Sequence, residues 1–129
     1  ARDLSIPYSA KAARLIAAQT ASAISNGVFF DLMYANENGW RFNEHKQYTF
    51  MRKYKNELLF IVVNFDNQPV NVAINVPSHA FDFLQIPQFD SYKAVDLLTD
   101  KVEEVSLLPY KATEIALGAY TGKILKIKF

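Results

Sequence analysis

The chain has 129 residues, with 14 basic and 13 acidic side chains and a formal net charge of +1. Half of its residues are hydrophobic and none is cysteine, which is typical of one globular domain and excludes disulfides and zinc–thiolate sites. It contains no run of basic residues and no apolar stretch near the ~20 residues of a membrane-spanning helix, so we expect no nucleic-acid partner and no membrane.

The first predicted element is an Ala-rich segment, Ser9–Ser25, which contains no Gly or Pro and is followed by Asn26-Gly27, a pair that commonly stops a helix. Small or apolar residues recur in it at spacings of three and four: Ala13, Ile16, Ala17, Thr20 and Ile24. The pattern predicts an amphipathic helix of about four to five turns with a thin apolar stripe. The chain starts at Ala1 without a targeting pattern, so we expect it to be a piece of a longer protein.

After Gly27 the period changes to two, and segments of Val, Ile, Phe and Tyr alternate with turn residues. The pattern predicts strands at Phe29–Tyr34, Gln47–Tyr54, Leu58–Asp66, Val70–Val76, Tyr92–Leu97, Glu103–Leu107, Ala112–Leu117 and Lys123–Phe129. Short strands joined by such turns favour a mainly β fold, a β-sandwich of about eight strands preceded by one N-terminal α-helix.

Several patterns indicate how these strands are arranged. Val70–Val76 alternates Val or Ile with Asn or Ala, which predicts a sheet with one wet face. Leu58–Val63 is apolar on both faces and is therefore expected to be central. Hairpin-like connections at Lys55–Glu57 and Asp66–Pro69 predict a three-stranded antiparallel meander over Gln47–Val76.

The longest predicted connection between strands runs from Pro77 to Pro87. Its sequence is compatible with one helical turn, for which Ser78 is the expected cap. Because a connection of this length is unusual within one sheet, we expect it to cross between the two sheets.

The acidic and histidine side chains show no catalytic pattern. A glycosidase needs two facing carboxyl groups, whereas Glu103 and Glu104 are adjacent on one predicted strand and face opposite sides. Asp96 ends a predicted strand, and we expect it to be a solvated surface acid or a turn cap. His45 and His79 lack the spacing of shared metal ligands, and four glycines cannot build a phosphate-binding loop. We therefore expect no catalytic residue, no metal and no cofactor.

Aromatic residues offer the one candidate binding site. Trp40, the only tryptophan, follows a predicted turn at Glu37–Gly39, and Tyr34 lies just upstream. An exposed pair of flat rings can stack on the apolar face of a sugar. Trp40 and Tyr34 are therefore the candidate sugar-stacking residues, although such rings more often lie in a core or at a domain interface.

Four segments occur in an order that resembles a known family: Gln47–Lys53, Glu57–Asp66 with its Val-Asn-Phe end, Asp96–Asp100 and Leu108–Leu117. They are similar to the C-terminal end of alpha-amylase family glycoside hydrolases. The segment Arg14–Asp31 resembles the last helix of the catalytic barrel of these enzymes, followed by the link into their C-terminal domain.

The resemblance implies two parts of the chain. Residues 1–27 would be the terminal helix of an upstream catalytic barrel plus a linker, and residues 28–129 a C-terminal antiparallel Greek-key β-sandwich. The catalytic aspartates and glutamate of the family belong to the barrel and have no matching position here, so this fragment would not itself be an enzyme. By analogy the parent enzyme is bacterial and either exported or periplasmic, with a cytoplasmic location left open.

The function implied is that of a non-catalytic accessory domain, which packs against and stabilises the barrel of an enzyme acting on α-glucans. The alternative is a starch-binding module that holds α-glucan on exposed aromatic rings. Separated from the barrel, the stripe containing Ile16 and Ile24 would be covered by the sandwich or by a second copy of the chain in a homodimer.

Overall fold

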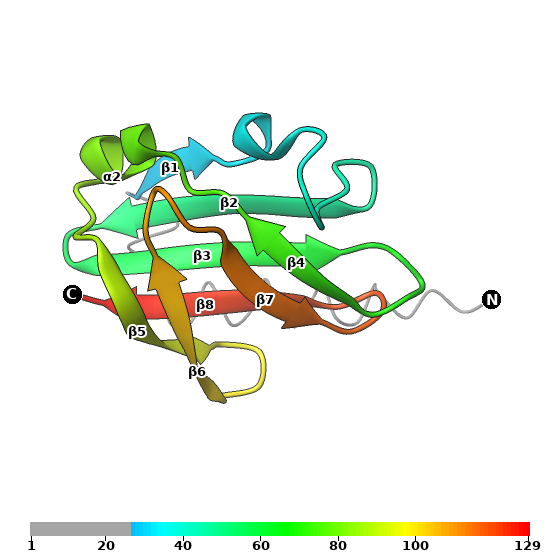
Figure 1. Cartoon of the computed structure of the whole chain (residues 1–129). Coiled ribbons are helices and arrows are strands. Elements are labelled where there is room, and N and C mark those ends of the chain that lie inside the picture. The colour runs from blue at the N-terminus through cyan, green and yellow to red at the C-terminus, as the bar shows by residue number, and fades with distance from the viewer. Residues whose placement is uncertain (1–26) are drawn as a thin grey trace.

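A computed structural model of the chain describes residues 27–129 (Figure 1). The predicted helix Ser9–Ser25 lies outside the described residues. The strands are β1 (Val28–Asp31), β2 (Gln47–Tyr54), β3 (Glu57–Asn64), β4 (Val70–Ile74), β5 (Phe89–Asp96), β6 (Val102–Leu107), β7 (Thr113–Leu117) and β8 (Gly122–Lys128). A 3₁₀ helix, η1 (Tyr34–Asn36), follows β1, and an α-helix, α2 (Ser78–Leu84), follows β4.

The strands form two antiparallel sheets of unequal size. The large sheet has six strands in the order β1-β2-β3-β8-β5-β6, and the small sheet pairs β4 with β7. Figure 1 shows β4 and β7 crossing one face of the large sheet, with α2 beside β1. The predicted mainly β sandwich of about eight strands is confirmed, and the chain crosses repeatedly between the sheets, as Greek-key connections do.

The predicted meander over Gln47–Val76 is wrong in its third strand. β2 and β3 form the expected hairpin, but β4 pairs with β7, and the other neighbour of β3 is β8. The chain leaves the large sheet after β3, where the side-chain amide of Asn64 donates hydrogen bonds to the carbonyls of Gln68 and Gly118, both at 2.9 Å. The central position of Leu58–Val63 is confirmed, because β3 lies between two strands.

The connection Pro77–Pro87 crosses from the small sheet to the large one, as predicted, and it contains α2 rather than a single turn. Ser78 is not the cap, because Pro77 occupies that position and no side chain caps the helix. The helix ends at Leu84, and the residue that caps it, Gln85, has a left-handed φ of 56°. In place of a side-chain cap, the helix is stabilised by burial of the face that carries Ala80, Phe81 and Leu84.

Apolar side chains collect on both faces of the large sheet. The main core lies under the small sheet and α2, and its fully buried members include Phe60, Val62, Val72, Ile115 and Leu125. A second buried cluster contains Leu59, Ile61, Leu97, Leu98 and Ile124. Since neighbours along β3 alternate between the two clusters, the clusters lie on opposite faces of the sheet.

Candidate functional site

The loop between β1 and β2, residues 32–46, carries both candidate stacking residues. Its anchor is Asn36, which is fully buried. The Asn36 amide nitrogen donates to the carbonyls of Leu32 (2.8 Å) and Asn75 (3.1 Å), and its amide oxygen accepts from the N–H of Asn75 (2.7 Å). These bonds fix the loop to the chain that follows β4 and therefore set the position of its exposed rings.

Arg41 joins the same loop to the small sheet. Its guanidinium carbon lies 4.4 Å from the ring centre of Trp40, and its Nη2 lies 2.6 Å from Oε1 of Glu114 on β7. Its carbonyl accepts a hydrogen bond from the N–H of Ala73 at 3.1 Å. The backbone of Arg41 is left-handed, with a φ of 57°, a conformation that non-glycine residues seldom adopt. The loop is therefore held in one geometry around Trp40.

Trp40 is 69% exposed, which excludes a role in the core. The Arg41 guanidinium occupies one face of the indole, so the other face is the one on which a flat ligand could stack. An exposed, positioned indole of this kind has the chemistry of a sugar-contacting side chain.

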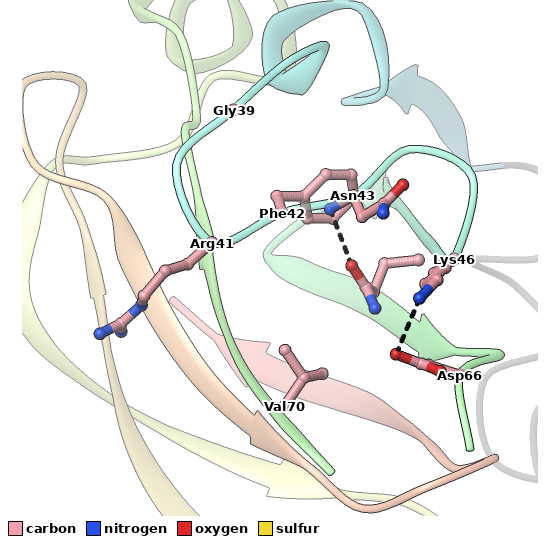
Figure 2. Close-up of a pocket in the computed structure, with 8 residues that line it drawn as sticks. Gly39, Arg41, Phe42, Asn43, Lys46, Asp66 and Val70 are labelled. Atoms are coloured by element: carbon pink, nitrogen blue, oxygen red, sulfur yellow. Dashed lines mark hydrogen bonds and ion pairs between the residues drawn. The ribbon is translucent and has the colours of Figure 1, made fainter. Parts of the chain in front are cut away.

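A pocket of about 340 Å³ opens beside Gly39 and Arg41, the two chain neighbours of Trp40 (Figure 2). It is lined by Gly39, Arg41, Phe42, Asn43, Lys46, Gln47, Asp66 and Val70. Nζ of Lys46 lies 3.5 Å from Oδ2 of Asp66, and the N–H of Asn43 donates to the Gln47 side chain at 2.8 Å. In Figure 2 the Arg41 side chain extends away from Asn43 and Lys46. Amide, ammonium and carboxylate groups around one depression can bind a ligand rich in hydroxyl groups.

Tyr34 lies on a different feature, which we call the aromatic surface. This shallow depression of about 490 Å³ is formed between β1, η1 and α2 by Phe29, Phe30, Asp31, Tyr34, His79 and Phe83. The ring centre of Phe30 lies 6.1 Å from that of Tyr34 and 5.8 Å from that of Phe83. Phe29, Tyr34 and Phe83 are each between 42% and 53% exposed. Because Tyr34 contacts Phe30 and Trp40 contacts Arg41, the two candidate rings do not form one platform.

Sequence reasoning missed several members of these surfaces. His79 and Phe83 lie on one face of α2, because residues four apart on a helix are neighbours. Both contact Phe30, and the ring centre of His79 lies 5.7 Å from that of Phe30. The sequence spacing of His79 and Phe83 was the available signal. The Arg41–Glu114 pair joins residues far apart in sequence, for which no local pattern exists.

Of the two roles expected for Asp96, the structure shows the turn cap. Its side chain is buried rather than solvated, with 3% exposure. Its carboxylate accepts from the N–H groups of Leu98 (3.1 Å) and Ile124 (3.3 Å) and from the hydroxyl of Thr99 (3.1 Å). Within residues 27–129 no three acidic or histidine side chains are placed to share a cation. In the same part of the chain, no helix has the length and apolar character needed to cross a membrane.

The loop that carries Trp40 should respond to acid. Oε1 of Glu44 accepts from the N–H of Asn38 at 2.9 Å, and this bond lowers the pKa of Glu44 below its ordinary value of 4.5. Because the pKa of Glu44 is lower in the folded chain, ionised Glu44 stabilises the loop at pH values above its ordinary pKa. This contribution is lost as the pH falls through the lowered pKa of the folded chain. We expect the Trp40 emission to change below about pH 4.5, and the change to be absent in Glu44→Gln.

The matched control for this titration is Glu37→Gln, which removes an exposed acid of the same loop. It should keep the acid-induced change in emission. A titration curve of Glu44→Gln that superimposes on that of the unaltered chain would contradict the assignment.

No protein-family model and no curated protein sequence matches the chain. Among solved structures, it is similar to a noncanonic maltogenic alpha-amylase from Thermotoga neapolitana, with a TM-score of 0.61 and 16% identity over 84% of this chain and 22% of that one. An Anoxybacillus alpha-amylase gives a TM-score of 0.59 and 18% identity over 95% of this chain and 22% of that one. A Geobacillus thermoleovorans alpha-amylase complexed with acarbose gives a TM-score of 0.54 and 17% identity over 83% of this chain and 19% of that one.

The chain therefore spans about a fifth of the length of these alpha-amylases. At identities of 16–18%, the likeness is one of fold.

Proposed function

We propose that residues 28–129 are the C-terminal accessory domain of an alpha-amylase family glycoside hydrolase, and that residues 1–27 are the end of its catalytic barrel plus a linker. The observation that carries this proposal is the recurrence of the fold within alpha-amylases as about a fifth of their length. The role that we propose for this part is to pack against the rest of the enzyme and stabilise it.

The segments that resemble the family support the proposal, because they have structural roles in this fold. Asn64 of the Val-Asn-Phe string is fully buried and hydrogen-bonded on all sides, and Asp96 of the Asp-Leu-Leu-Thr string caps a buried turn. Their presence is accounted for by the sandwich itself, without any catalytic role.

The aromatic surface is the part of the described residues best suited to contact a catalytic barrel. Tyr34 (53% exposed) and Phe83 (52% exposed) both contact the Phe30 ring and form an exposed apolar patch of the kind that marks an interface. β1, which supplies Phe29 and Phe30, starts directly after residues 1–27, so the patch lies where an upstream domain would enter.

The proposal is tested on the longer protein that contains this chain. We expect that protein to act on α-glucans, and deletion of residues 28–129 to accelerate thermal inactivation while the barrel alone retains its specificity. Phe83→Asp should have a milder effect of the same sign, and Tyr110→Asp, an exposed aromatic far from the aromatic surface in sequence, is the control. A longer protein without glycoside hydrolase activity would refute the family assignment, and an unchanged inactivation rate would refute the packing role.

The exposure of Trp40, whose chain neighbours Gly39 and Arg41 line a pocket, favours a second candidate function, α-glucan binding. Pairs of aromatic rings contribute about 0.5–1.5 kcal/mol beyond area burial, and we take the same scale for a sugar stacked on an indole. We expect a saturable change in the fluorescence of Trp40, the only indole, on titration with maltoheptaose. Calorimetry should then show an affinity for maltoheptaose that is about tenfold lower in Trp40→Ala. The affinity should be unchanged in Tyr34→Ala, because Tyr34 belongs to the aromatic surface. A flat fluorescence response from the folded chain would refute this candidate.

A further inference from the structure

The large sheet carries apolar residues on the face turned away from the small sheet, which we call the outer face. Phe50 lies opposite Ile61, and Ile61 lies opposite Ile124, so one apolar row crosses β2, β3 and β8. Leu59 belongs to the same cluster. Antiparallel sheets that face water on one side alternate apolar and polar residues, so an outer face of this composition indicates a further layer of protein.

Burial on the outer face is as deep as in the main core. Leu59 is 1%, Ile61 7% and Ile124 3% exposed. Leu97 and Leu98 reach this cluster from the turn after β5. The ion pair between Lys126 and Glu57, at 3.2 Å, has both side chains only 19% exposed, and register places these residues at the same face as Leu59.

We propose that the segment Ser9–Ser25 of this chain packs on the outer face as an amphipathic helix, with the stripe that contains Ile16 and Ile24 against Ile61 and Ile124. A third layer formed in this way converts the two-sheet sandwich into a helix–sheet–sheet arrangement. This placement applies to the chain separated from a catalytic barrel, in which the stripe has no barrel strands to contact. The inference therefore does not rest on the proposed function, because both surfaces belong to the chain itself.

The length of the segment and its point of attachment favour this occupant. A helix of this size spans about 25 Å at 1.5 Å per residue. The distance from β1 to β8 is three strand spacings, about 14 Å. Asn26 and Gly27 join the segment to β1, the edge strand of the same sheet. The segment can therefore reach the outer face directly from its last residue.

The composition of the stripe also fits a flat sheet. Apart from its two isoleucines, the stripe consists of Ala13, Ala17 and Thr20, whose small side chains allow the helix axis to approach closely. The isoleucines then meet the apolar row formed by Phe50, Ile61 and Ile124. Polar residues of the segment, including Lys11 and Gln19, lie mostly off the stripe and would face solvent.

Cross-linking tests this placement cleanly, because the chain contains no cysteine of its own. Ile16→Cys or Ile24→Cys is combined with Val63→Cys, a half-buried position beside the second cluster, and treated with a short bismaleimide. We expect a cross-linked monomer. The control pairs the same helix positions with Asn71→Cys, exposed on β4 of the small sheet, and should not cross-link within the monomer.

Each other result of that experiment overturns the inference. Cross-linked dimers would show that a second copy of the chain covers the outer face. Equal cross-linking at Val63 and Asn71, or none at either, would show that the segment has no fixed position on the outer face.

A second measurement does not need cysteine variants. Ile24→Asp places a charge in the stripe, whereas Gln19→Asp places the same charge off it. We expect amide exchange at Ile61 and Ile124 to accelerate about tenfold or more in Ile24→Asp and to stay unchanged in Gln19→Asp. The same exchange rates in both variants would contradict the proposal.

Discussion

Replacement of Asn64 by alanine is expected to lower the free energy of unfolding by about 3–5 kcal/mol, because several buried polar groups lose their partners together. The Asn64 amide nitrogen donates to the carbonyls of Gln68 and Gly118, and its oxygen accepts from the Gln47 side chain (3.0 Å) and the N–H of Asp66 (3.0 Å). Urea unfolding followed by far-UV circular dichroism measures the loss.

The chain offers two informative companions to this variant. Asn71→Ala removes an exposed asparagine from β4 and should change stability by no more than about 0.5 kcal/mol. Asn64→Asp keeps the shape and the accepting oxygen but turns a second oxygen toward the carbonyls of Gln68 and Gly118. Protonation of that carboxyl would restore one donor, so Asn64→Asp should gain stability relative to Asn64→Ala as the pH falls. Equal stability of Asn64→Ala and Asn71→Ala would contradict the structural role.

The arrangement of strands was predicted where it depends on local pattern. β2 begins and ends at the predicted residues, Gln47 and Tyr54, because alternation and a short turn fix both the strand and its hairpin. The pairing of β4 could not be predicted in this way. Its partner β7 lies some forty residues away, and the choice is made by packing over the main core and by the Asn64 bonds. The alternation of apolar residues shows which face of a strand is buried, but it does not define which strand pairs with it.

For the candidate binding residues, the local sequence pattern could indicate the exposure of a side chain but not its surroundings. A turn rich in polar residues indicated that Trp40 could be exposed, and it is. The separation of Tyr34 from Trp40 follows from Asn36, which is buried between them in sequence and fixes the loop to Asn75. An asparagine in a turn normally indicates a local bond to its own backbone, so its sequence context carried no sign of this tertiary anchor.

Asp96→Ala is the second replacement for which a large effect is expected, a loss of about 2–4 kcal/mol in the free energy of unfolding. The carboxylate is 3% exposed and accepts from two backbone N–H groups, those of Leu98 and Ile124, and from the Thr99 hydroxyl. Hydrogen bonds to an ionised acceptor are stronger than neutral ones, and the Leu98 N–H would be left buried without a partner. Guanidinium unfolding of the variant measures the loss.

Asp96→Asn separates charge from geometry in this turn. Its amide oxygen can still accept from Leu98 and Ile124, so we expect it to recover about half of the loss. Asp90→Ala, an exposed acid of the same strand, should be close to neutral. Because Ile124 and Leu98 belong to the second cluster, Asp96→Ala should also accelerate amide exchange on the outer face. A variant as stable as Asp90→Ala would show that the turn after β5 holds its shape without the carboxylate, and that Leu97 and Leu98 are kept on the outer face by apolar packing alone.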